Sequence, residues 1–97
     1  MTAFRTTKKR LENQCEYLNR ITNSPAEYSR KVDGKWRANP GHYHINWDYN
    51  QPQLQRVCND GGGVENVLGY RGTKSEVDRM IGAFIKGIEA AQREATK

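Results

Sequence analysis

The chain has 97 residues, enough for one small domain that folds alone but too few for a large buried active-site cavity. It is 35% hydrophobic and 28% charged, and holds two tryptophans and five tyrosines, which is too aromatic for a disordered chain. No segment approaches the roughly 20 apolar residues of a membrane span, and the opening residues lack the apolar core of a signal peptide. We therefore expect a single domain over 1–97, frayed at 1–5 and 95–97, in the cytoplasm.

The formal net charge is +5, and the whole excess lies in the first 37 residues, which hold nine lysines and arginines against four acids. A localised basic region is typical of proteins that bind a polyanion, of which nucleic acid is the first candidate. The alternative explanation is that the charge serves only to keep the protein soluble. The two cysteines, Cys15 and Cys58, match no pairing motif. We expect both as buried thiols in a reducing compartment; the alternative is one disulfide in an exporting cell.

The segment KKRLENQCEYLNRIT carries apolar side chains at helical spacing, which predicts a first helix. Thr6 or Thr7 serves as its N-cap, and Asn23-Ser24-Pro25 ends it. A basic cluster opens this helix, where the helix dipole disfavours cations. The cluster therefore indicates either an anionic partner or an unfavourable placement that the fold merely tolerates. The apolar positions are Leu11, Cys15, Leu18 and Ile21; the basic cluster is Lys8, Lys9 and Arg10.

The next segment, EYSRKVDGKWRANPGHYH, is centred on Asp33-Gly34, a dipeptide that favours a tight hairpin turn. It predicts a short basic ribbon, the best functional candidate of the chain, in which cations would bind phosphates and an aromatic ring would stack on a base. The competing interpretation is a solvated loop whose tryptophan folds back onto the core, which is what a tryptophan more often does. The ribbon cations are Arg30, Lys31, Lys35 and Arg37, and the aromatic residues among them are Trp36 and Tyr28.

Strict alternation in GHYHINWDYN predicts a strand over 43–49, with Tyr43, Ile45, Trp47 and Tyr49 on the core face. Turns at 50–53 and 59–63 separate it from strands at 54–59 and from Val64 to Leu68 or Tyr70, an antiparallel meander. His42, His44 and Asp48 share the opposite face. Because no third metal ligand or pocket is evident there, we expect no metal site and read this face as the more solvated side of the sheet.

A capping box, Thr73-Lys74-Ser75-Glu76, opens the last helix, whose predicted apolar face runs from Val77 to Ala91 through Met80, Ile81, Phe84 and Ile88. Gly82 and Gly87 are expected to permit close packing. The helix start, with Arg71, Thr73 and Lys74, is a weaker candidate for a single phosphate, although an ordinary cap is favoured. The phosphate-loop pattern G-x-x-x-x-G-K-[ST] is absent from the preceding glycine run.

These elements predict an α+β fold of order α-β-β-β-α, in which a three-stranded antiparallel meander packs against two helices and a short basic ribbon precedes the first strand. The stretches YLNRITNSPAEY, ANPGHYHINWDYNQPQLQRVCNDGGGVENV and GTKSEVDRMIGAFIKGIEAA resemble a group of small, uncharacterised proteins of tailed bacteriophages and prophages. That resemblance implies a phage setting and a host cytoplasm, without a mechanism. The element order is also similar to double-stranded RNA-binding domains, but the mixed charges of 74–79 differ from their phosphate-gripping lysine cluster.

Two functional hypotheses follow from these observations. The first is a phage accessory protein that binds nucleic acid through the basic cluster and the ribbon. The second is a module that docks on a host or phage protein, or on itself, through large apolar anchors. No nucleophile, base and orienting group can be named together, so we expect neither an enzyme nor a cofactor.

Overall fold

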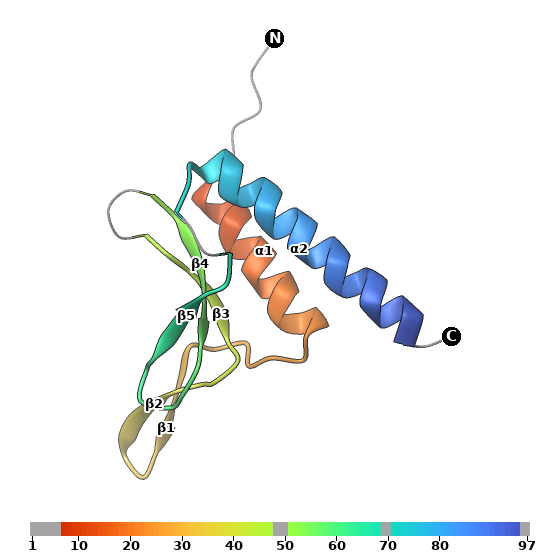
Figure 1. Ribbon diagram of the computed structural model, residues 1–97. Coiled ribbons are helices and arrows are strands. Elements are labelled where there is room, and N and C mark those ends of the chain that lie inside the picture. The colour runs from red at the N-terminus through yellow and green to blue at the C-terminus, as the bar shows by residue number, and fades with distance from the viewer. Residues whose placement is uncertain (1–6, 48–50, 69–70, 96–97) are drawn as a thin grey trace.

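The computed structural model describes residues 7–47, 51–68 and 71–95. It confirms an α+β fold whose strands form one three-stranded and one two-stranded antiparallel sheet (Figure 1). In chain order the elements are α1 (Lys8–Ile21), β1 (Ser29–Val32), β2 (Lys35–Ala38), β3 (Tyr43–Asn46), β4 (Gln53–Val57), β5 (Val64–Asn66) and α2 (Lys74–Ala95). Residue 95 is the last residue of α2; the predicted frayed residues 1–5 and 96–97, and also Thr6, Asp48, Tyr49 and Tyr70, lie outside the described residues.

The start and end of α1 follow from its local sequence. Thr7 is the N-cap, because its side-chain oxygen accepts the backbone N–H of Arg10 at 3.1 Å. The helix ends at Ile21, and Asn23 then adopts a positive φ of 56°. Leu11, Cys15 and Leu18 are buried, which confirms the predicted apolar stripe.

The three-stranded sheet has the order β3-β4-β5, as expected for a meander. In its register Ile45 pairs with Leu54, and Val57 pairs with Val64. Because β4 ends at Val57, Cys58 lies beyond the strand and is exposed. The prediction of a buried thiol is therefore right for Cys15 and wrong for Cys58.

Both helices pack against this sheet, and they lie side by side with their N-termini at the same end (Figure 1). From β3, Tyr43 and Ile45 enter the core, as their alternation predicted, while Trp47 is only partly buried. From α2, the fully buried side chains are Val77 and Ile81, followed by Ile85 at 9% exposure. No helix within the described residues is long and apolar enough to cross a membrane.

The two glycines of α2 do not serve the close packing predicted for them. A Cβ atom built on Gly82 or on Gly87 would meet no heavy atom within 4 Å outside the local helix backbone. Ala91, which was assigned to the apolar face, is exposed. The buried face of α2 is therefore narrower and shorter than its sequence pattern indicated.

A buried asparagine joins α1 to the edge of the sheet. Asn19 is 3% exposed, and its side-chain amide donates to the Tyr43 carbonyl at 3.0 Å and accepts the Tyr43 N–H at 2.7 Å. Since β3 is an edge strand, no strand within the described part of the chain neighbours these two backbone groups on that side. Asn19 thus satisfies buried polar groups that would otherwise lack partners.

Candidate nucleic-acid interface

A tight turn at Asp33-Gly34 joins β1 and β2 into the two-stranded ribbon. Asp33 and Gly34 have φ angles of 51° and 77°, the two positive values that a tight primed hairpin turn requires. The strands pair in antiparallel register with Lys31 opposite Trp36 and Val32 opposite Lys35. All eight residues from 30 to 37 are exposed, and the ribbon projects from the body of the molecule (Figure 1).

Trp36 does not fold back onto the core. Its exposed fraction is 69%, the largest among the exposed large hydrophobic residues that the structure describes. Its cross-strand neighbour Lys31 places Nζ 5.8 Å from the ring centroid, a cation–π contact on the outer surface of the ribbon. The interpretation that the sequence favoured, a tryptophan folded back onto the core, is therefore wrong.

The ribbon cations occupy both of its faces. Side chains that pair directly across an antiparallel ribbon share a face, so Arg30, Arg37 and Lys35 lie on the face opposite to Lys31 and Trp36. The Arg30–Arg37 pair juxtaposes like charges, which is unfavourable without a counter-charge. Arg30 is tied to the root of the ribbon, where its Nη1 donates to the Ala38 carbonyl at 2.9 Å and to Asn39 Oδ1 at 2.7 Å.

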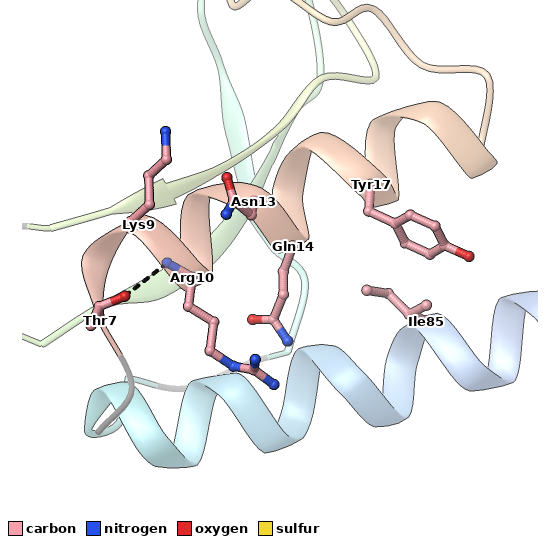
Figure 2. Close-up of a pocket in the computed structure, with 7 residues that line it drawn as sticks. All are labelled: Thr7, Lys9, Arg10, Asn13, Gln14, Tyr17 and Ile85. Carbon is pink, nitrogen blue, oxygen red and sulfur yellow. Dashed lines mark hydrogen bonds between the residues drawn. The ribbon is translucent and has the colours of Figure 1, made fainter. Parts of the chain in front are cut away.

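The basic cluster of α1 does not join the ribbon. The first turn of α1 and the ribbon lie at opposite ends of the molecule (Figure 1). Lys8 places Nζ 5.3 Å from the ring centroid of Trp47, while Lys9 is exposed and points away from α2 (Figure 2). The N-terminal basic third is thus divided between two separate surfaces.

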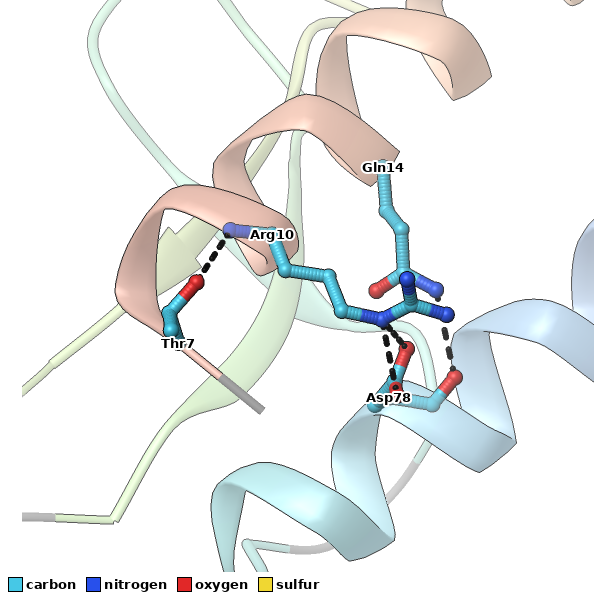
Figure 3. A network of polar contacts seen from close by, with 4 residues as sticks. All are labelled: Thr7, Arg10, Gln14 and Asp78. Atoms are coloured by element: carbon cyan, nitrogen blue, oxygen red, sulfur yellow. Dashed lines mark hydrogen bonds and ion pairs between the residues drawn. The ribbon is translucent and has the colours of Figure 1, made fainter. Parts of the chain in front are cut away.

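Arg10 holds the two helices together. Its Nε donates to both carboxylate oxygens of Asp78, at 2.9 and 3.0 Å, and Gln14 Nε2 donates to the Asp78 carbonyl at 3.3 Å (Figure 3). The Asp78 side chain is only 11% exposed, so Arg10 supplies the counter-charge that a buried carboxylate needs. This pairing makes Arg10 a structural residue and weakens its assignment to phosphate binding.

The start of α2 forms an ordinary cap. The Thr73 N–H donates to Glu76 Oε1 at 3.0 Å, and the Glu76 N–H donates to Thr73 Oγ1 at 3.2 Å, which confirms the capping box. Arg71 Nη1 donates to the Gln51 carbonyl at 3.0 Å. The carboxylate of Glu76 therefore occupies the position that a bound phosphate would take beside Thr73, and only Lys74 remains as an exposed cation of this candidate site.

His42 and His44 lie stacked, with ring centroids 5.9 Å apart, and Tyr28 covers both rings edge-on at 6.0 and 5.3 Å. His42 is 8% exposed, and its Nδ1 lies 2.9 Å from the Pro25 carbonyl and 3.3 Å from Asn19 Nδ2. The prediction of a more solvated face is wrong here, because the chain between α1 and β1 covers it. Among the described residues no group of three or more His, Cys, Asp or Glu side chains could hold a metal ion.

One ring nitrogen of His44 has a hydrogen-bond partner, and the other has none among the described residues. Its Nε2 lies 3.2 Å from Gln55 Oε1, whereas Nδ1 is buried without a hydrogen-bond partner among the described residues. Burial lowers the pKa of His44; His42 adds to the decrease, and the bond to Gln55 opposes it. The neutral imidazole is the form that this site favours.

A groove of about 400 Å³ lies beside these histidines, between α1 and β3. Cys15 and Glu12 also line it. Burial, reinforced by Glu12, raises the pKa of the Cys15 thiol to about 12. Because the thiolate is the nucleophilic form, Cys15 is unsuited to nucleophilic catalysis at neutral pH.

A second groove, of about 380 Å³, runs along α1 where it faces α2 (Figure 2). Its lining is polar apart from Tyr17 and Ile85. It contains no histidine, cysteine or carboxylate side chain, so it offers neither a nucleophile with a base nor a set of metal ligands. Its lining residues are Thr7, Lys9, Arg10, Asn13, Gln14, Tyr17 and Ile85.

Sequence reasoning missed Asn19 and Asp78 as organising residues, and it grouped Tyr28 with Trp36 as a ribbon aromatic, whereas Tyr28 packs against His42 and His44. Each of the three acts on a partner distant in the chain. Only Asp78 carried a signal, a charge amid the apolar positions of α2. No family model, curated protein or solved structure matches the chain. Of the surfaces predicted from sequence, the ribbon keeps its tryptophan ring and all four of its cations exposed.

Proposed function

We propose that this chain is a small, non-enzymatic accessory protein that binds nucleic acid through the β1–β2 ribbon, in keeping with the phage setting that the sequence resemblance implies. The observation that carries the proposal is the 69% exposure of Trp36 in a ribbon that also carries four cations. A two-stranded ribbon is only marginally stable by itself in water, and an exposed tryptophan there adds nothing to the core. Phosphate contacts and base stacking use this combination of side chains.

Three of the four ribbon cations are in a position to bind phosphate groups of a ligand. Lys31, Lys35 and Arg37 are exposed, and no ion-pair partner lies beside them among the described residues. A protein partner anchored by Trp36 would be the alternative, but four cations on the two faces of one short ribbon favour a polyanion. With about three phosphates neutralised, log K should fall against log salt with a slope of about −2 to −3.

A salt series of fluorescence-anisotropy titrations with short labelled DNA and RNA tests this proposal. Lys35→Gln should weaken binding at low salt and make the slope shallower by about 0.7 to 0.9. Lys86→Gln is the matched control, since it removes the same charge from an exposed position on α2. Failure of every nucleic acid to bind at low salt would refute the proposal, as would equal effects of the two substitutions.

A further inference from the structure

We propose that the ribbon prefers single-stranded nucleic acid to duplex, with Trp36 as the platform on which one unpaired base stacks. This inference rests on the proposed function and specifies its ligand as an unpaired base with its adjoining phosphates. Single-stranded DNA and RNA share that chemistry.

The first argument is the accessibility of the indole. With 69% of Trp36 exposed, a flat apolar ring is open to a ligand from solvent. Inside a duplex both faces of each base are already stacked on neighbouring base pairs, and opening a step costs free energy. An unpaired base can cover the ring without that cost, so stacking on Trp36 favours a single strand.

The second argument is the placement of the cations. Lys31 lies beside Trp36 on one face of the ribbon, whereas Lys35 and Arg37, the chain neighbours of Trp36, project from the other face. A flexible single strand can bend over β2 and reach cations on both faces while one base stays stacked. A duplex is stiff over about 150 base pairs and cannot wrap a ribbon of four-residue strands.

A duplex could still meet both faces if the ribbon entered its major groove, which is wide enough for a two-stranded ribbon. In that arrangement Trp36 would face base edges and the sugar–phosphate backbone, with no aromatic face to stack on. Duplex binding would then depend on the cations and little on the indole. The two binding modes therefore differ in how much the loss of Trp36 weakens the affinity: strongly for a stacked single strand and little for a duplex.

The test compares a labelled 12-nucleotide single strand, as DNA and as RNA, with the DNA duplex of the same sequence at one low salt concentration. We expect the single strands to bind at least tenfold more tightly. Trp36→Ala should weaken single-strand binding by about 5- to 150-fold, and Trp36→Phe by much less, since Phe keeps an aromatic face. In a Trp47→Phe background, single strands should quench the remaining tryptophan fluorescence.

The outcomes separate this inference from the proposed function. Duplex binding that equals or exceeds single-strand binding would overturn the inference and leave nucleic-acid binding intact. A single-strand affinity unchanged by Trp36→Ala would do the same. Absence of binding to all three probes would refute the proposed function itself. Because Trp36 is exposed, circular dichroism should show that Trp36→Ala folds like the parent chain.

Discussion

Replacing Asn19 by alanine removes the amide that joins α1 to the edge of the three-stranded sheet. Both backbone polar groups of Tyr43 then lose their partner in a region where Tyr43 itself is 8% exposed. A buried polar group left unsatisfied costs about 1 to 3 kcal/mol. The better helix propensity of alanine offsets less than about 1 kcal/mol of this loss in the free energy of unfolding. We expect Asn19→Ala to lower the free energy of unfolding by about 2 to 5 kcal/mol.

Urea unfolding followed by circular dichroism at pH 7.5 measures this loss, and the midpoint should fall while the slope m stays constant. Asn13→Ala is the matched control, because Asn13 is exposed on the same helix and undergoes the same chemical change. The difference between the two variants isolates the contacts to Tyr43 from helix propensity. A difference below about 1 kcal/mol would refute the reasoning, because it is smaller than the cost of even one unsatisfied buried group.

Three further predictions concern glycine, cysteine and histidine. Gly82→Ala and Gly87→Ala should each raise the free energy of unfolding by about 1 kcal/mol, because the added Cβ meets open space and alanine favours a helix; a loss of stability in urea unfolding would contradict this. In the folded protein a thiol reagent at pH 7.5 should modify the exposed Cys58 at once and Cys15 only after urea is added, since burial raises the pKa of the Cys15 thiol to about 12; equal rates would be inconsistent with this packing. Burial lowers the pKa of His44 below its usual 6.5, so the unfolded chain binds a proton there that the folded chain resists. The contribution of His44 to stability should therefore be fully present well above pH 6.5 and be lost as the pH falls below 6.5, so that stability falls more steeply in the parent than in His44→Gln; parallel pH profiles would remove His44 as the cause.

Much of the local structure could be predicted, because its determinants are close in the chain. The Thr73–Glu76 capping box joins groups three residues apart, and the Asp33-Gly34 turn depends on two consecutive φ angles. The apolar spacing of α1 likewise needs only the helical period. Each of these features is decided by a few consecutive residues, whatever the rest of the chain does.

The candidate site was predicted in composition but not in arrangement. The sequence placed Arg10 and Arg37 in one basic region, yet Arg10 is bound to Asp78, 68 residues away, and Arg37 lies on the distant ribbon. Charge counted along the chain cannot distinguish a cation that neutralises a buried carboxylate from one that faces solvent. That distinction depends on which residues of α1 and α2 become neighbours.

By itself, the sequence determined the element types, the α+β class, the hairpin turn and the excess positive charge of the first 37 residues. Only the tertiary structure decided that His42 is buried beneath Tyr28 and Pro25, and that Trp36 stays in solvent. The physical reason is that burial is a property of what packs over a side chain. A strand pattern identifies which residues share a face, but the segment that covers this face is supplied by another part of the chain.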